Sequence, residues 1–150
     1  MRKIWPWCIA AGVFAADRLT KILSAGIPAE GQVLIPGVIG LRRAENYGIA
    51  FSLLSGRPWL LGLLSLVIIA AAFFFLRGRK LHSLTTAGLM MMLGGACGNL
   101  TDRLLAGSVP DMVELLFVRF AIFNAADVCL VAGGVLVMAD LLLGGRKKHG

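Results

Sequence analysis

The sequence predicts a membrane protein of the all-α class, with four transmembrane helices, a small extracytoplasmic β-platform and a short outer helix or loop. Hydrophobic residues make up 58% of the 150 residues, charged residues make up 15%, and the mean hydropathy is +0.84. Soluble domains usually contain about 45–50% apolar and about 25% charged residues. Four apolar stretches are separated by polar segments, and they cover residues 4–23, 58–76, 83–104 and 121–143. As helices they are each about 28–34 Å long, which matches the roughly 30 Å hydrocarbon core of a bilayer.

Short basic runs predict how these helices cross the membrane. They precede the first stretch, separate the second from the third, and follow the fourth: Arg2 and Lys3; Arg77, Arg79 and Lys80; Arg146, Lys147 and Lys148. Because short cytoplasmic loops carry most of the Lys and Arg, we expect both termini in the cytoplasm and residues 24–57 and 105–120 on the outer face. The net charge of +7 is therefore interpreted as topological, and no nucleic-acid partner is expected.

The first stretch is expected to remain as an uncleaved span. It begins like a secretory signal, with basic and then apolar residues, but polar residues and further apolar stretches follow. Near its outer end, Asp17 and Lys21 are one helical turn apart, which favours an ion pair or a helix-end anchor over a catalytic pair. We expect residues 1–150 to form a single membrane domain.

The outer segment 24–57 predicts a small hairpin platform. It is rich in Gly and Pro, and it contains β-leaning pieces at Gln32–Ile35 and Val38–Leu41. After these pieces, Asn46 and the residues that follow it run toward the second apolar stretch.

The third apolar stretch is predicted to run outward and the fourth to run back inward. Asp102 beside Arg103 is expected to pin the outer end of the third helix, with a direct part in the chemistry as the alternative. The fourth helix is expected to start at Ala121, which places Asp127 about 9 Å below that start. Glycine pairs at 94–95 and 133–134 predict close helix packing.

Polar residues from four distant regions are thus expected in one shallow layer near the outer face. They are Asp17, Asn46, Asn99, Asp102, Asp111, Asn124 and Asp127. An ionisable residue inside a span costs on the order of 2.5–3.5 kcal/mol on insertion scales, so such a cluster requires a reason. Asp140 lies alone near the cytoplasmic end of the fourth span, and we assign it no catalytic role. His82 and His149 are expected to be solvated.

Two carboxylates in a partly dry site offer a specific chemistry. They cannot both ionise comfortably, so one keeps a proton while the other can deprotonate a water molecule. That water could attack an amide carbonyl, and no metal or other cofactor is expected. Depth alone leaves open whether Asp111 and Asp127 form such a pair or support the structure, and Asn99 and Asn124 could be interhelical hydrogen-bonding groups. The three cysteines lie in apolar stretches without CxxC spacing, so neither a disulfide framework nor a metal site is indicated.

Five motifs follow one another along nearly the whole chain. They are DRLTK at residues 17–21, NYGIAFS at 46–52, GGACGNLTDR at 94–103, VPD at 109–111 and FNAAD at 123–127. Together and in this order they resemble the lipoprotein signal peptidases, also called type II signal peptidases, which are aspartyl peptidases of bacterial cytoplasmic (inner) membranes. The fold that this resemblance implies is a four-helix bundle with an outer β-platform and a short outer helix near the site.

The resemblance implies an endopeptidase that removes the signal peptide from diacylglyceryl-modified prolipoproteins, cleaving before the lipid-modified cysteine. It assigns the catalytic pair to Asp111 and Asp127. It implies roles in substrate binding or positioning for Asn46, Gly48, Asn99, Arg103 and Asn124, and structural support from Asp17, Lys21 and Asp102. The expected partners are the lipid-modified prolipoprotein and membrane lipids, and we expect a monomer.

A few positions depart from the family pattern. Pro110 and Met112 flank Asp111 where an aliphatic and an aromatic residue are expected, and Cys97 and Ile49 replace smaller or plainer residues. The segment Leu105–Val118, which carries Asp111, is predicted to be mobile, with Gly107 as its hinge.

A small proton- or cation-coupled transporter is the main alternative function, but it would favour charges near the midplane and a broken or repeated helix pair. A non-catalytic helix scaffold would leave the two aspartates unexplained.

Overall fold

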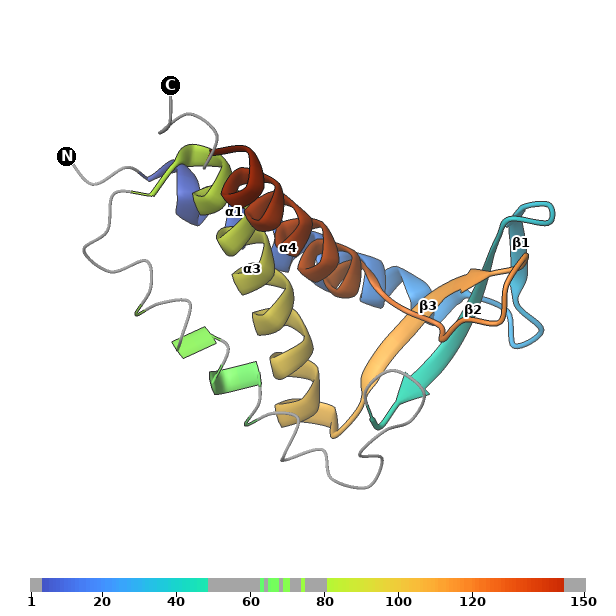
Figure 1. The fold of residues 1–150 in the computed structure, drawn as a ribbon. Helices are drawn as coiled ribbons and strands as arrows, with labels where there is room; N and C mark the ends of the chain where they lie inside the picture. The colour runs from blue at the N-terminus through green and yellow to red at the C-terminus, as the bar shows by residue number, and fades with distance from the viewer. Residues whose placement is uncertain are drawn as a thin grey trace.

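The structure, a computed structural model, describes residues 4–48, 63, 65–67, 69–70, 74 and 81–144. Its long helices are α1 (Trp5–Leu23), α3 (Ser83–Ala106) and α4 (Ala125–Gly144), and a short 3-10 turn, η1 (Ser24–Gly26), follows α1. Three antiparallel strands form a sheet in the order β1 (Gln32–Ile35), β2 (Ile39–Asn46) and β3 (Val109–Leu115). The sheet stands at one end of the helices, and the start of α1 and the end of α4 lie at the other end (Figure 1).

The helix bounds agree with three of the four predicted stretches. α1 and α3 match residues 4–23 and 83–104 within two residues, whereas α4 begins four residues later than expected. The stretch at 58–76 lies mostly outside the described residues, and those of its residues that are described are helical. Within the described part of the chain, Ala125–Leu143 is the one helical segment long and apolar enough to cross a membrane, with a mean hydropathy of 2.1.

Local chemistry explains where the helices begin and end. Pro6 lies in the first turn of α1, where its missing N–H costs nothing. Gly107 ends α3 in the left-handed conformation, with φ +73°, and its N–H donates to the carbonyl oxygen of Arg103 at 3.1 Å. Its predicted role as a hinge is not tested by this cap.

Close glycine contacts bring α3 against α4 and α1. A Cβ atom added to Gly133 would lie 2.5 Å from the carbonyl oxygen of Gly88, and one added to Gly95 would lie 2.6 Å from that of Ala126. On the other side of α3, a Cβ atom on Gly94 would lie 2.6 Å from the carbonyl oxygen of Ala10 in α1. Three of the four residues in the predicted glycine pairs therefore pack closely, whereas nothing lies within 4 Å of a Cβ atom on Gly134.

The sheet confirms one predicted strand, extends another and adds a third. β1 has the predicted bounds Gln32–Ile35, while β2 continues to Asn46. The outer segment expected at residues 105–120 contains a strand, because β3 pairs with β2 from Ile39 opposite Leu115 to Asn46 opposite Val109. Pro110 fits there because β3 is an edge strand, where a missing backbone donor is tolerated.

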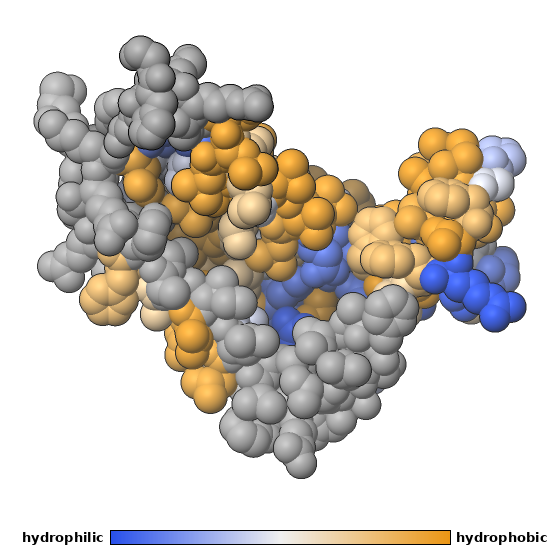
Figure 2. Space-filling view, viewed as in Figure 1, coloured by the Kyte–Doolittle hydropathy of each residue, from blue (hydrophilic) through white to orange (hydrophobic). Residues whose placement is uncertain are grey.

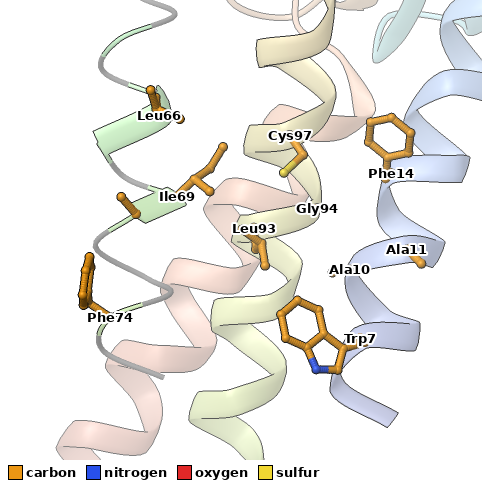
Figure 3. Close-up of a pocket in the computed structure, with 11 residues that line it drawn as sticks. Trp7, Ala10, Ala11, Phe14, Leu66, Ile69, Phe74, Leu93, Gly94 and Cys97 are labelled. Carbon is orange, nitrogen blue, oxygen red and sulfur yellow. The ribbon is translucent and has the colours of Figure 1, made fainter. Parts of the chain in front are cut away.

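The molecular surface is apolar over the helices and polar where they meet the sheet. Figure 2 shows hydrophobic residues along the helices and hydrophilic ones gathered at the junction between the helices and the sheet. An apolar groove of about 670 Å³ runs between α1, α3 and described residues of the predicted second span. Trp7 and Phe14 of α1 line it opposite Leu66 and Phe74 (Figure 3). Such surfaces suit helices that face lipid rather than water.

Candidate active site

Asp111 is a buried carboxylate in β3 held by two side-chain amides. Asp111 is only 2% exposed. The Asn46 amide donates to its Oδ2 at 2.8 Å, and the Asn124 amide donates to its Oδ1 at 2.6 Å. The backbone N–H of Gly48 donates to Asn46 Oδ1 at 2.9 Å, so the Asn46 NH₂ group is left to face Asp111.

Asp127 lies in the first turn of α4 and helps to cap that helix. Its backbone N–H donates to Asn124 Oδ1 at 3.0 Å, and the Asn124 backbone N–H donates to Asp127 Oδ2 at 3.2 Å. This reciprocal pair is a capping box, with Asn124 as the N-cap. The Asn99 amide donates to the other oxygen, Asp127 Oδ1, at 2.9 Å. Asp127 is thus at the start of its helix, not about 9 Å below it as the expected start at Ala121 implied.

The backbone between β3 and α4 brings the two aspartates to the same residue, Asn124. After β3 the chain turns back, and Phe123 pairs with Val113 through hydrogen bonds of 2.9 and 3.1 Å. Asn124 therefore stands beside β3. Its NH₂ group donates to the Asp111 carboxylate, and its side-chain oxygen accepts from the backbone N–H of Asp127. The structure therefore places both carboxylates against one residue, since Asp111 accepts from the Asn124 NH₂ group and the Asp127 carboxylate accepts from the Asn124 backbone N–H.

Burial shifts the proton equilibrium of Asp111. Desolvation raises the pKa of this carboxyl from 3.8 to about 6, the hydrogen bonds from Asn46 and Asn124 oppose the rise, and the charge of Asp127 adds to it. A carboxyl with this pKa can hold a proton much closer to neutral pH than an exposed aspartate can. The arrangement therefore provides one carboxyl able to donate a proton beside a second carboxylate.

A buried ion cluster joins α1 to α3 next to this pair. Lys21 Nζ donates to Asp17 Oδ2 at 2.9 Å and to Asp102 Oδ2 at 2.6 Å, which confirms the predicted ion pair of Asp17 with Lys21. Arg18 donates to both oxygens of Asp102, at 2.6 and 2.7 Å, and to Asp17 at 2.9 Å. A Cβ atom on Gly98 would collide with the Asp17 carboxylate, so the small residue lets α3 approach.

This cluster shows how Asp102 holds the end of α3, as predicted, and adds a residue that the sequence reasoning missed. Asp102 pins the end of α3 by pairing with Arg18 and Lys21 of α1, rather than with its neighbour Arg103. Arg18 stood in the DRLTK motif without an assigned role. Its charge inside an apolar stretch was the available signal, because such a residue needs a partner.

Arg103 extends from α3 toward the end of β2. Its guanidinium donates to the carbonyl oxygen of Gly48 at 3.2 Å and to that of Asn99 at 3.4 Å. The structure thus brings Asn46, Gly48, Asn99, Arg103 and Asn124 together around the two aspartates. Residues 49–52 of the NYGIAFS motif, including Ile49, lie outside the described residues.

Asp140 has partners that the sequence reasoning did not predict. His82 Nδ1 lies 2.9 Å from Asp140 Oδ1, and Thr85 donates to Asp140 Oδ2. Asp140 is therefore not a lone carboxylate, and His82 is exposed but paired. His82 directly precedes α3 and Asp140 lies near the last turn of α4, and these helix ends are remote from the sheet (Figure 1). His149 lies outside the described residues.

Comparisons with known proteins agree with one another. A family model described as signal peptidase (SPase) II matches residues 9–143. The chain is 33% identical to the lipoprotein signal peptidase of Brevibacillus brevis, over 97% of this chain and 100% of that protein. It is 37% identical to the lipoprotein signal peptidase of Gloeobacter violaceus, over 97% of this chain and 83% of that protein.

Solved structures extend the likeness to the fold. One, described as a bacterial membrane enzyme, superposes with a TM-score of 0.86 at 28% identity and covers 95% of this chain and 90% of its own. A second with the same description has a TM-score of 0.81 at 28% identity, over 91% and 92% of the two chains. Because the family model spans most of the sequence and these relatives match almost all of it, the chain belongs to the signal peptidase II family and is a membrane peptidase.

Proposed function

We propose that Asp111 and Asp127 are the catalytic pair of an aspartyl endopeptidase that removes the signal peptide from diacylglyceryl-modified prolipoproteins. The scissile bond is the one before the lipid-modified cysteine. The observation that carries this assignment is that both carboxylates accept from Asn124, Asp111 from its side-chain NH₂ group and Asp127 from its backbone N–H, although the two aspartates belong to β3 and α4. The names of the relatives support the substrate class.

The pair would act on a water molecule placed between the two carboxyl groups. One carboxylate accepts a proton from that water, and the oxygen attacks the carbonyl carbon of the scissile bond. The protonated partner donates a hydrogen bond to the carbonyl oxygen and later gives its proton to the leaving nitrogen. The raised pKa of Asp111 supports a pair that shares one proton, and this proton belongs to the pair rather than to one member.

The surrounding polar groups would hold the pair and the substrate backbone. Asn46, Asn99 and Asn124 supply amide donors to the two aspartates. Arg103 and Gly48 border the same site and would bind the substrate main chain. The ion cluster of Asp17, Lys21 and Asp102 would support this architecture by tying α1 to α3.

In the membrane, we propose four spans with both termini in the cytoplasm of a bacterial cell and the sheet on the outer side of the cytoplasmic membrane. The sheet and the aspartates stand at the same end of the helices, and in the sequence the basic runs flank the start of α1, the start of α3 and the end of α4. The lipid chains of the substrate could then stay in the bilayer while its scissile bond reaches the pair. The monomer is proposed as the working unit, with membrane lipids as its surroundings.

The decisive test compares the purified enzyme with Asp111→Asn and Asp127→Asn variants on a diacylglyceryl-modified prolipoprotein. We expect both variants to fold and neither to cleave, because each retains only one ionisable member of the pair. Asp140→Asn serves as the matched control and should keep most activity, since Asp140 lies at the far end of the helices. Cleavage by either site variant at the parental rate, or inhibition by a chelator that added metal reverses, would refute the proposal.

A further inference from the structure

Lys21 makes one more hydrogen bond than the ion cluster requires. Its ammonium group has three protons, and the residue is only 6% exposed. Two protons go to the carboxylates of Asp17 and Asp102, and the third goes to the neutral Asn99 Oδ1 at 2.9 Å. Arg18 also contacts both carboxylates. The bond from Lys21 to Asn99 also joins α1 to α3, but it ends on a side chain that in turn donates to Asp127.

The Asn99 side chain connects this ammonium group to the two aspartates. Its Oδ1 accepts from Lys21 at 2.9 Å and from the Asn124 NH₂ group at 3.3 Å. Its Nδ2 donates to Asp127 Oδ1 at 2.9 Å. The same Asn124 NH₂ group also donates to Asp111, so one chain of contacts runs from Lys21 to both members of the pair.

The charge of Lys21 decides which way the Asn99 amide points. An ammonium group only donates hydrogen bonds, so it requires an oxygen opposite. A flipped Asn99 would place its NH₂ group against the ammonium group and its oxygen against the Asp127 carboxylate. Both contacts would be repulsive, which excludes the flipped amide as long as Lys21 is charged.

We propose that Lys21 is a positioning residue of the reaction, which locks the Asn99 amide so that its NH₂ group faces Asp127. The proposal rests on the catalytic roles of Asp111 and Asp127 proposed above. The hydrogen bond from Asn99 stabilises the carboxylate form of the pair, which is the form able to accept a proton from water. Lys21 thus acts through Asn99 and does not touch the substrate.

The neighbouring charges define what loss of Lys21 would do. The charged or titratable groups that the described residues place around the pair are Asp17, Arg18 and Lys21 on α1, Asp102 and Arg103 on α3, Asp111 on β3, and Asp127 and Cys129 on α4. Without Lys21, the pair loses a nearby positive charge, and the Asn99 amide loses the group that fixes its orientation. Both changes make the pair hold a second proton more tightly. As the pH falls, the variant should therefore lose activity at a higher pH than the parent does.

The test measures the pH profile of kcat/KM for Lys21→Met and Arg18→Met. Both substitutions remove one positive charge from the same cluster, but only Lys21 contacts the Asn99 side chain. For Lys21→Met we expect the acidic limb to move upward by about one pH unit, the size expected when a hydrogen bond to a charged group is lost. For Arg18→Met the limb should stay within a few tenths of a unit of the parent, whatever happens to stability.

A charge-balanced variant covers the case in which Lys21→Met does not fold. Asp17→Asn combined with Lys21→Met removes one charge of each sign and leaves the contacts of Arg18 with Asp102 in place. It should show the same shift of the acidic limb. An unmoved limb in the Lys21 variants, or an equal shift in Arg18→Met, overturns the role of Lys21. If Asp111→Asn or Asp127→Asn instead cleaves at the parental rate, the proposed function itself has failed.

Discussion

Asn124 has two separable tasks in this molecule. Its oxygen caps α4, and its NH₂ group contacts Asp111 and Asn99. Serine can replace an N-cap oxygen at little cost, but it cannot supply the NH₂ group. Substitution of Asn124 can therefore distinguish its role in capping α4 from its role in positioning the two aspartates.

We expect Asn124→Ser to retain most of the stability and to lose at least about tenfold in kcat/KM, because Asp111 loses its shorter amide contact while a cap remains. Asn124→Ala should lose the same activity and, in addition, about 1 kcal/mol of stability with the cap. Peptide cleavage and thermal unfolding in the same detergent measure the two effects. Equal activity in Asn124→Ser and the parent would show that the contact with Asp111 is dispensable.

The raised pKa of Asp111 makes stability depend on pH. In the folded chain this carboxyl has a pKa of about 6, against an ordinary value of 3.8, so the folded state binds its proton more tightly than the unfolded state does. By linkage, the contribution of Asp111 to stability is most favourable below about pH 4 and is lost as the pH rises through about 6. The full effect of two pH units is on the order of 3 kcal/mol.

Asp111→Asn should remove this dependence. Between pH 4 and pH 7, the free energy of unfolding of the variant should rise relative to that of the parent, because only the parent has to bury a charge at this position. Unfolding curves in detergent at several pH values measure the difference. Asp140→Asn, the control, should follow the pH trend of the parent.

At the scale of the elements, the crossing of α3 and α4 depends on one of two adjacent glycines. A Cβ atom on Gly133 would lie 2.5 Å from the Gly88 carbonyl oxygen and 2.7 Å from Met92 Cγ, whereas one on Gly134 would meet nothing within 4 Å. Gly133→Ala should therefore lower the free energy of unfolding by about 1–3 kcal/mol, since the helices must move apart. Gly134→Ala should leave it unchanged or raise it by up to about 1 kcal/mol. Thermal unfolding of the two variants in one detergent checks the contrast.

The elements that the sequence predicted best are those with a regular hydrophobic pattern. Residues 4–23 and 83–104 are uniformly apolar except at their polar ends, and they match α1 and α3. The start of α4 was placed too early because residues 121–123 are apolar and extend the hydrophobic run. Asn124 followed by Asp127 is the local signal for the helix start, since each side chain can accept from the other's backbone N–H.

β3 could not be predicted from its own residues. The segment Val109–Leu115 contains Pro110, Asp111 and Glu114, which are depleted in strands. Its strand conformation comes from pairing with β2, a partner distant in sequence, and Arg42 of β2 reinforces it by donating to Glu114 at 2.6 Å. The site residues, in contrast, were identified from their motifs, while their contacts with one another depend on the packing of α1, α3 and α4.

At the scale of the whole molecule, the proposed orientation can be tested by chemical labelling. Cys8, Cys97 and Cys129 would first be replaced by Ala, and a single cysteine would then be introduced as Glu30→Cys beside the sheet or as Lys148→Cys near the C-terminus. An impermeant maleimide should label Glu30→Cys in intact spheroplasts and should label Lys148→Cys only after lysis. The opposite pattern would contradict the orientation that the basic runs predict.

The capping box of α4 also limits how this enzyme can evolve. Asp127 is spaced from Asn124 by the geometry of a helix start, and the same spacing brings its carboxylate to the Asn99 amide. One residue inserted between Asn124 and Asp127 would rotate the aspartate by about 100° around the helix and move it by about 1.5 Å along the axis. Insertions and deletions can therefore accumulate in the neighbouring loops, but natural selection should remove them from this four-residue interval.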